Sequence, residues 1–516
     1  MRYVLAILLT TTASASDILA TPWSECCANQ NQPKDAVTLE AGDPQLFVDD
    51  WIIGEQDNLK RTLHQPVKDH RGEKPIIPTP PGQRTLTAKS TILYDPGLRR
   101  YVMYAKALPA ARIYRYVSDD GMTWRGGDDG KLQQVQIDRR HPVEGVILEN
   151  QYTAMHTAYY DPDAPEYPYK AWWGFGNWGP EYEGFYYSRS KDGIQWERRQ
   201  QVVNCFNGGG DPSSVTIHQD GQTVYGPGDT TRFSYDPVTG RFLGIFKFFR
   251  PDPVGPGNQL RSRAYAFFDR LDERFDIDRL DRVALLPSAK AENGDQPTDE
   301  YYASTAYRCG NLWLGELLVW HSRDDYPYSE DGCTFAKLVS SRDGLHWKKV
   351  RFPNEDGIPE VYVPNGPEGG NDGQNDGGHM SLFSQGPLRI GNELILYYGC
   401  TSYGKNTPRP KRVSGGGIFR ARLRPHGFVS VDQGSLTTRP LRFKGQKLSV
   451  NSRGTVIVEV LEIEGKVLGA ARVHGDSLDH HVRFDGASLG KLASGKRVRL
   501  RFSVNGDGEL YSFTVN

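Results

Sequence analysis

The sequence predicts an all-β fold, a five-bladed β-propeller followed by a C-terminal β-sandwich, and three observations lead to this prediction. The 516 residues include 56 Gly, 33 Pro, 27 Tyr and 21 Phe but only 5 Met, a composition typical of short strands joined by turns. One seven-residue pattern recurs along the chain, and five segments have the composition of β-hairpins. Recurrence at a regular interval indicates a repeat architecture.

The recurring pattern is Ser-x-Asp-Gly-x-x-Trp, which occurs at residues 118–124, 190–196 and 341–347. The second interval is close to twice the first, which indicates a regular repeat with one decayed copy. The Ser and Asp side chains can hydrogen-bond the turn backbone, Gly allows a positive φ angle, and Trp can pack between blades. A turn that holds the fold together is needed in every blade, whereas an active site is needed once. We therefore interpret the pattern as structural.

Five hairpin signatures mark five units of about 75 residues, each with β-rich runs on both sides of a turn. They lie at residues 90–104, 157–173, 232–246, 304–315 and 388–398. Degenerate segments at 265–269 and 418–423 follow the third and fifth hairpins, where the pattern is expected. Four strands per unit fit the blades of a propeller. We expect the strand at 46–53 to complete the last blade and close the ring.

The N-terminus has the pattern of a secretory signal peptide, with a basic start, an apolar run at 4–9 and small residues at 13–15. The predicted organisation is therefore a signal peptide at 1–16, an N-terminal leader at 17–40, the propeller as catalytic domain at 41–430 and the β-sandwich at 431–516. In the last of these, apolar and polar residues alternate as in half-buried strands. We expect the protein to be secreted or periplasmic.

Charge and cysteine spacing argue against several kinds of partner. With 62 basic and 63 acidic residues the net charge is −1, so no overall field favours nucleic acid or an anionic membrane. We expect neither partner, and we expect a monomer. None of the six cysteines shows C-x-x-C spacing, so no zinc site is predicted. Cys309 and Cys333 are candidates for a disulfide, and burial as small apolar side chains is the alternative.

Acidic residues precede the first strand of four of the five units, and these are the candidate catalytic residues. In order of preference they are Asp376, Glu300, Asp229 and Glu149. Because the first strands of a propeller surround its axis, these acids are expected to ring one end of the channel. Converging carboxylates separate in pKa, and glycosidic bond cleavage needs one protonated acid and one carboxylate. The alternative is that the acids cap turns or pair with arginines.

Candidate substrate-binding residues are polar or aromatic side chains near the same positions. They are His379, Asp299, Tyr301, Trp173 and His64, with Tyr302 as a further aromatic that could stack on a sugar face. Core packing or a satisfied histidine is the alternative for each. No cofactor is predicted. The segment 372–383 partly resembles a calcium loop, but Phe383 stands where a bidentate Glu belongs, so a structural Ca²⁺ has only weak support.

The chain resembles the five-bladed propeller glycoside hydrolases, and more closely secreted bacterial proteins similar to families 32 and 43. The resemblance rests on the segments 46–53, 63–66, 376–378, 397–399, 427–430, 497–502 and 510–513. It implies a catalytic propeller with a C-terminal β-sandwich that cleaves a glycosidic bond at a chain end. The chain departs from family 32 because it lacks the Trp-Met-Asn-Asp-Pro-Asn-Gly and Arg-Asp-Pro motifs, so fructan specificity does not carry over. The first unit also lacks the acid that both families use.

Two functions are consistent with these observations. The first is a secreted exo-acting glycoside hydrolase that cleaves a plant or algal oligo- or polysaccharide with the carboxylates at the channel mouth. The second is a carbohydrate-binding propeller without catalytic activity, which the missing acid of the first unit favours. Release of product from a substrate would distinguish the two. The fold alone does not specify a substrate.

Overall fold

The computed structural model describes residues 36–516 with internal gaps. The gaps are residues 89–91, 110–111, 128, 141–151, 177–181, 204–214, 220, 253–258, 275–281, 288–295, 297, 323–330, 354–359 and 406–414. The signal peptide at 1–16, most of the leader and the candidate acid Glu149 lie outside the described residues. The domain boundaries and the export of the protein therefore stay predictions.

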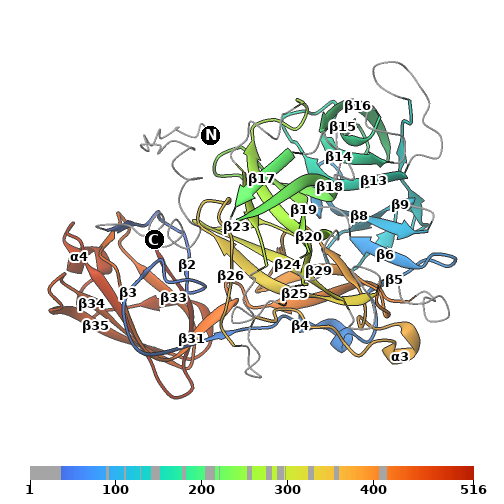
Figure 1. Ribbon diagram of the computed structural model, residues 1–516. Helices are drawn as coiled ribbons and strands as arrows, with labels where there is room; N and C mark the ends of the chain where they lie inside the picture. The colour runs from blue at the N-terminus through green and yellow to red at the C-terminus, as the bar shows by residue number, and fades with distance from the viewer. Residues whose placement is uncertain are drawn as a thin grey trace.

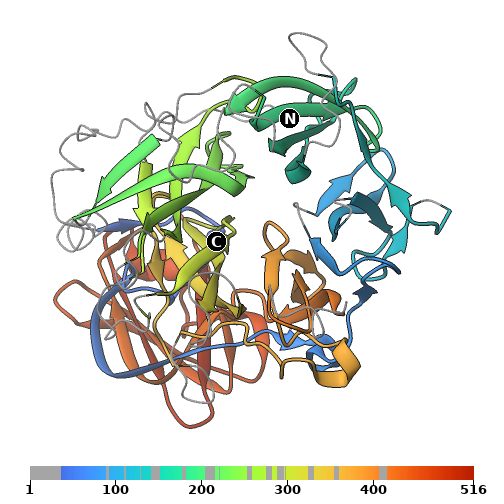
Figure 2. The same cartoon turned by 45° about the vertical axis from the view of Figure 1, so that its right-hand side comes forward.

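Five sheets stand side by side in a ring and form the predicted five-bladed propeller (Figure 2). Blade one comprises β6 (Thr85–Ala88), β7 (Leu93–Asp95), β8 (Arg100–Leu108), β9 (Arg112–Ser118), β10 (Arg125–Gly126) and β11 (Gln133–Gln134). Blade two comprises β12 (Gln136–Ile137), β13 (Tyr152–Tyr160), β14 (Tyr169–Gly176), β15 (Gly184–Ser190) and β16 (Gln195–Val203). Blade three comprises β17 (Val215–Gln219), β18 (Gln222–Tyr235), β19 (Phe242–Pro251), β20 (Gln259–Phe268) and β21 (Arg282–Leu285). The strands of the five sheets pair antiparallel, except that the short β12 pairs in parallel with β16.

Blade four comes from the middle of the chain, whereas blade five combines residues 380–423 with two short strands from residues 67–78. Blade four comprises β22 (Glu300–Ser304), β23 (Tyr307–Cys309), β24 (Leu312–Ser322), β25 (Gly332–Ser341) and β26 (Lys348–Lys349). Blade five comprises β27 (Met380–Phe383), β28 (Leu388–Ile390), β29 (Glu393–Cys400), β30 (Gly417–Leu423), β4 (Val67–Lys68) and β5 (Ile77–Pro78). Short helical turns η1 (Asp69–Gly72) and α3 (Gly370–Gly373) flank blade five.

The antiparallel order of strands gives the ring two different ends. We call β6 with β7, β13, β18, β22 with β23, and β27 with β28 the first strands of the five blades. The second strands are β8, β14, β19, β24 and β29, and the third strands are β9, β15, β20, β25 and β30. The first strand of each blade begins at one end, which we call the first-strand end, and there the second strand ends and the third begins. The loop that follows the third strand lies at the opposite end. We call this the turn end, because the Ser-x-Asp-Gly-x-x-Trp turns directly follow β9, β15 and β25. The repeated turns and the candidate acids are therefore on opposite ends of the propeller.

The ring is closed by a different segment from the one that the sequence predicts. The segment 46–53 does not pair with blade five. Instead β2 (Gln45–Leu46) pairs with β38, and β3 (Ile53–Leu63) pairs with β31, both in the C-terminal sheet. The ring closes through β4 and β5, which pair with β30. The apolar side chains of Phe47 and Ile52 explain the difference, because they are completely buried in the C-terminal core.

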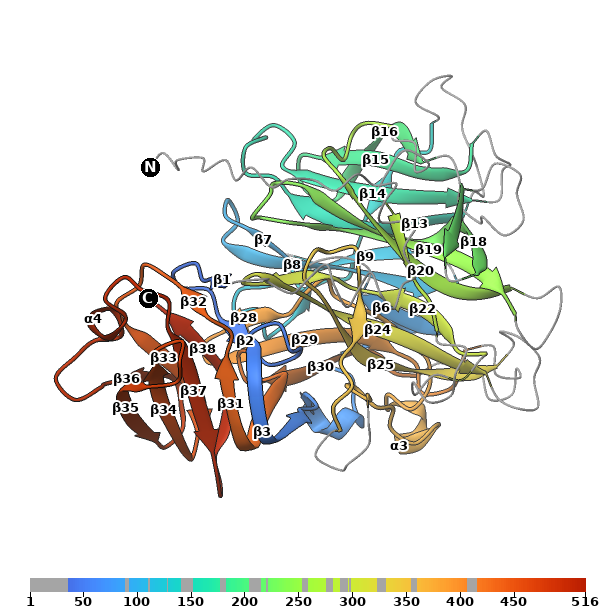
Figure 3. The same cartoon turned by 60° about the vertical axis from the view of Figure 1, so that its left-hand side comes forward.

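The C-terminal region is a nine-stranded antiparallel sheet that lies beside the propeller (Figures 1 and 3). Its strands are β2, β3, β31 (Val429–Thr438), β33 (Leu448–Arg453), β34 (Thr455–Leu461), β35 (Val467–His474), β36 (Ser477–Val482), β37 (Arg499–Val504) and β38 (Glu509–Val515). The short strands β1 (Val37–Thr38) and β32 (Leu441–Arg442) pair in parallel beside it, and α4 (Leu489–Ala493) is a single short helix. Both ends of the sheet contribute to one apolar core, for example through Val473 and Val482. The sheet therefore curves around its own core.

The repeated turns have the structural role that the sequence predicts. In each, the Asp carboxylate accepts from the Ser hydroxyl and from two backbone amides; around Asp192 these bonds measure 3.0, 2.7 and 2.9 Å. The same bonds surround Asp120 and Asp343. The Gly that follows has a φ angle of 72 to 80° in all three turns. Only glycine adopts this angle without strain.

The Trp of each turn packs against a tyrosine of the preceding blade. Trp347 stacks on Tyr265 of blade three with ring centroids 4.9 Å apart, and Trp196 contacts Tyr104 of blade one at 6.0 Å. Trp124 of blade one contacts Tyr397 of blade five at 5.6 Å. Aromatic pairs of this kind bury much apolar surface and fix the angle between neighbouring sheets. The repeated turn therefore joins one blade to the next.

The proposed pairing of Cys309 with Cys333 is wrong, because neither cysteine forms a disulfide. Cys309 is paired with the first residue of β24 and Cys333 with His321 near its other end, so the strand separates them along its length. Cys400 is also free and is buried. Among the described residues, no helix is long and apolar enough to cross a membrane.

Candidate functional site

The first-strand end of blade three presents Asp229, and its carboxylate is the centre of the candidate site. Asp229 lies on β18 at the point where this strand meets Lys247 of β19. The Lys247 ammonium donates to Asp229 Oδ1 at 2.6 Å. The Asp229 side chain is 35% exposed, whereas that of Lys247 is only 7% exposed. Asp229 is thus an accessible carboxylate that pairs with a buried ammonium.

The cations around Asp229 keep its carboxyl group ionised. Burial by itself would raise the pKa of Asp229, but the charges of Lys247, Arg261 and Lys405 outweigh it and hold that pKa well below its usual range. Conversely, burial lowers the pKa of Lys247, and the Asp229 charge opposes this effect. The site therefore stabilises an anion at Asp229.

Glu300, the first residue of β22, is brought to the same cation as Asp229. Its Oε2 accepts from the Arg261 guanidinium at 2.6 Å and from the Arg261 backbone amide at 3.0 Å. The Glu300 side chain is completely buried. Arg261 therefore stands between two of the predicted acids, in a hydrogen bond to Glu300 and within electrostatic reach of Asp229.

An aromatic group of Tyr302, Trp320 and His379 lies beside these charges and joins blades four and five. Tyr302 stacks on Trp320 with centroids 5.6 Å apart, and the His379 ring meets Tyr302 edge-on at 4.7 Å. Thr334 holds the His379 ring through a 2.6 Å hydrogen bond to Nδ1. Trp320 and His379 are buried, whereas Tyr302 is partly exposed. Tyr302 is thus the accessible part of an apolar surface of the kind that sugar faces contact.

Lys405 adds a cation to this aromatic group from a position far along the chain. Its ammonium lies 5.0 Å from the centroids of both Tyr302 and Trp320. Its backbone amide donates to the Gly332 carbonyl at 3.1 Å, which ties the segment after β29 to blade four. The Arg261 guanidinium lies 5.3 Å from the Tyr302 ring on the same group. Attraction between cations and aromatic faces stabilises this arrangement.

Asp376, the preferred catalytic acid, has surroundings of a different kind. Its side chain is completely buried and forms a 2.6 Å ion pair with Lys68 of β4, the strand that closes the ring. Tyr398 donates to the same carboxylate at 2.7 Å. Gly72 packs so closely on it that a Cβ at that position would lie 2.5 Å from a carboxylate oxygen. These contacts hold the N-terminal segment against blade five, and the catalytic role of Asp376 stays a prediction.

The remaining candidates for substrate binding are distributed over the molecule. Asp299 is at the first-strand end, where its Oδ1 pairs with Nδ1 of the half-exposed His321 at 3.0 Å. Tyr301 and Trp173 are buried in the apolar cores between blades. Their aromatic side chains fit the alternative interpretation, core packing. The structure thus brings Asp229, Glu300, Asp299 and His379 to one end of the ring.

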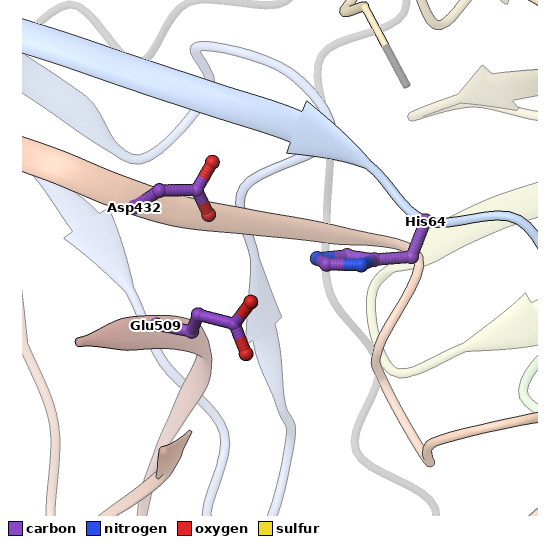
Figure 4. Close-up of side chains that lie close together, drawn as sticks. All are labelled: His64, Asp432 and Glu509. Carbon is purple, nitrogen blue, oxygen red and sulfur yellow. The ribbon is translucent and has the colours of Figure 1, made fainter. Parts of the chain in front are cut away.

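His64 lies away from this site, in a cluster with Asp432 and Glu509 on the C-terminal sheet. Figure 4 shows the three side chains pointing toward one another, and their potential ligand atoms lie within 4.8 Å of each other. They could hold a metal ion. However, hydroxyl groups of Ser430, Thr62 and Tyr511 already donate to the two carboxylates, and the His64 ring bonds the Ser430 hydroxyl at 2.7 Å. These hydrogen bonds account for the cluster without an ion. It does not involve the segment 372–383, which only partly resembles a calcium loop.

Sequence reasoning missed the cations of the site, Lys247, Arg261 and Lys405. Lys247 and Arg261 lie on the second and third strands of blade three, at the end where the first strand begins. Because both cations lie at the same end of their strands, an alignment of the hairpins could have indicated them as candidates. Lys405 follows the second strand of blade five, and no local pattern indicates that it contacts Tyr302 of blade four.

No protein-family model matches the sequence, and no curated protein matches it significantly. Several solved structures are similar, among them a family 43 arabinoxylan arabinofuranohydrolase from Bacillus subtilis in complex with cellotetraose. It has 11% identity, a TM-score of 0.36, and coverage of 88% of this chain and 99% of that one. An exo-inulinase from Aspergillus awamori gives 11% identity, a TM-score of 0.37, and coverage of 88% and 99%.

A third similar structure is an N-acetylgalactosamine deacetylase from F. plautii in complex with blood group B trisaccharide. It has 14% identity, a TM-score of 0.39, and coverage of 72% of this chain and 95% of that one. The names therefore include both glycoside hydrolases and a deacetylase. At these identities and TM-scores the similarities carry no argument about the reaction, and the propeller itself follows from the sheet topology.

Proposed function

We propose that the protein is a secreted, exo-acting glycoside hydrolase that cleaves a glycosidic bond in a plant or algal polysaccharide at the first-strand end of its propeller. The observation that carries this proposal is the accessible, ionised carboxylate of Asp229 beside the aromatic group of Tyr302, Trp320 and His379. Sugar sites commonly combine an aromatic surface with a few charged groups that fix the orientation of the ligand.

The two roles of a glycosidase require two different groups. Asp229 takes the role of the carboxylate, as base or nucleophile, because the surrounding cations disfavour its protonation. Glu300 accepts two hydrogen bonds from Arg261, so we assign it to positioning that cation. We assign proton transfer to His321, which is 53% exposed and whose Nδ1 contacts Asp299.

The exo mode of action is supported by the interior of the ring. Arg232 of β18 is almost completely buried, and its Nη1 donates to the backbone carbonyl of Phe383 at 2.9 Å. This bond links the first strands of blades three and five, which are not adjacent in the ring. Because this side chain crosses the interior of the ring, we expect the polysaccharide to enter by one chain end, at the first-strand end.

The test is product release by the purified protein and by the variants D229N, H321Q and K191Q. On a polysaccharide that the parent protein shortens from one end, we expect D229N to lower kcat by at least a factor of about 10³, as loss of a catalytic carboxylate does. H321Q should lower kcat less, with a changed pH profile. K191Q is the matched control, because Lys191 is exposed at the turn end. Full activity of D229N would overturn the assignment.

A carbohydrate-binding propeller without catalytic activity is the second candidate. It is favoured by the complete burial of Asp376 and Glu300, which leaves Asp229 as the accessible acid among the candidates that the structure describes. Glycan binding by the parent protein, with no product at high protein concentration, would establish this alternative. A further experiment adds azide to a D229G variant, because azide can replace a missing catalytic carboxylate and form a glycosyl azide. Formation of this product would support the hydrolase, whereas a protein that only binds sugars would not form it.

A further inference from the structure

We infer that the site binds an acidic sugar, one that carries a carboxylate or sulfate group, with this group held by Lys405. The inference rests on the proposed site but concerns the ligand and not the reaction. It begins with Lys405, whose ammonium contacts the Tyr302 and Trp320 rings at 5.0 Å each. Among the described residues, no carboxylate forms an ion pair with Lys405, in contrast to Lys247 and Arg261.

The cations of the site differ in whether a carboxylate pairs with them. Lys247 pairs with Asp229, and Arg261 pairs with Glu300, so each of these cations has its own anion. Two further cations, Arg263 and Lys405, lie within electrostatic reach of Asp229 or of its neighbours. Among the described residues, Arg263 and Lys405 differ from Lys247 and Arg261, because neither of them forms an ion pair with a carboxylate.

The buried Arg263 also favours a bound anion at this end of the ring. Its side chain is completely buried, with Nε and Nη1 bonded to the backbone carbonyls of Tyr301 and Thr230, while Nη2 has no hydrogen-bond partner among the described residues. Burial and the charge of Arg261 lower the pKa of Arg263 to about 9. Concentrating cations in this way is costly unless an anion offsets them. A bound anionic group would offset part of this charge.

The position of Lys405 also agrees with a sugar-bound anion. A pyranose that covers the exposed side of Tyr302 would place an attached carboxylate or sulfate near the ammonium above the same ring. The favourable contact would be a charge-assisted hydrogen bond, the strong kind of polar contact. The nearby Asp229 carboxylate would repel an anion, but its own pairing with Lys247 reduces that repulsion. We therefore expect selectivity for acidic over neutral sugars at the position of Lys405.

Calorimetric titration with methyl glucuronoside, methyl glucoside and glucose 6-sulfate tests the inference without requiring turnover. We expect the glucuronoside or the sulfate to bind at least about tenfold more tightly than the neutral glucoside, with affinity that falls as salt is added. Preference for one of the two acidic ligands identifies the group. Equal or tighter binding of the neutral glucoside would overturn the inference.

The variants K405Q and K405R make the test specific for this side chain. K405Q should lower the affinity for the acidic sugar about tenfold to a hundredfold and leave the neutral sugar unaffected. K405R keeps the charge and should retain most of the affinity, whereas K191Q should behave as the parent protein. If K405Q binds the acidic sugar as the parent does, Lys405 is not the contact. Acidic binding without turnover of any substrate would refute the hydrolase while leaving this inference intact, and turnover of neutral substrates alone would do the reverse.

Discussion

At the turn end of the propeller three blades carry the same Ser-x-Asp-Gly-x-x-Trp turn, whereas at the first-strand end blades three, four and five each present a different side chain. Blades three, four and five contribute Asp229, Glu300 and His379 there. The turn end repeats because every pair of neighbouring sheets needs the same joint. The first-strand end varies because one ligand contacts several blades at once, and each contact is made only once. Repetition therefore distinguishes the residues that hold the fold from those that could perform chemistry.

The largest effect on stability is expected at the turn end, from the substitution W347A. Trp347 is 1% exposed, stacks on Tyr265, and donates from Nε1 to the Gly344 carbonyl at 2.7 Å. Its removal should lower the free energy of unfolding by about 3–5 kcal/mol, measured by urea denaturation. The folded variant should bind sugars as the parent does. Loss of affinity at unchanged stability would show that the two ends are not independent.

The substitution D376N should have the next largest effect and decides which kind of region Asp376 belongs to. Loss of one partner of the buried pair with Lys68 should cost about 3 kcal/mol, the lower end of the usual range, because Asn can keep the Tyr398 bond. The double variant D376L/K68M, which removes both charges, should recover part of the loss. If instead D376N is as stable as the parent and inactive, Asp376 is catalytic, as the sequence predicts.

The substitution K247M is expected to change the pH dependence of activity. In the parent, Lys247 and its neighbours hold the pKa of Asp229 low, so Asp229 stays ionised and contributes no acid limb near its usual pKa. Without Lys247 the pKa of Asp229 should rise by about one unit, which corresponds to about 1.4 kcal/mol. On acidification, the variant should therefore lose activity at a higher pH than the parent does. K170M, which breaks the 2.8 Å pair with Asp161 at the turn end, should leave the profile unchanged.

The smallest effect is expected from D192A in the turn of blade two. The carboxylate of Asp192 bonds the Ser190 hydroxyl and two backbone amides, much as a helix N-cap does. Its removal should cost about 1–2 kcal/mol of unfolding free energy. K191A in the same turn should change stability by no more than about 0.5 kcal/mol, because Lys191 is exposed. Equal effects of the two substitutions would remove the argument that the Asp defines the turn.

The local parts of this protein could be predicted from its sequence. The number of blades, the hairpins, the turn geometry around Asp120, Asp192 and Asp343, and the packing role of the three Trp residues could all be predicted. These features depend on residues a few positions apart, and hydrogen bonds within a turn form wherever that turn occurs. The same reasoning located Asp229, Glu300 and His379 at one end of the ring, because each precedes or begins a first strand.

The accessibility of those residues, and the charges that surround them, depend on contacts between distant parts of the chain. Asp376 and Asp229 occupy similar positions in the repeat, but Lys68 from the start of the chain covers Asp376, whereas Asp229 stays exposed. Lys405 reaches Tyr302 from another blade. The ring closure through β4 and β5 also joins segments from opposite ends of the sequence. Burial and electrostatic environment depend on such distant neighbours, and a carboxylate becomes an ion-pair partner or an accessible anion according to which of them it meets.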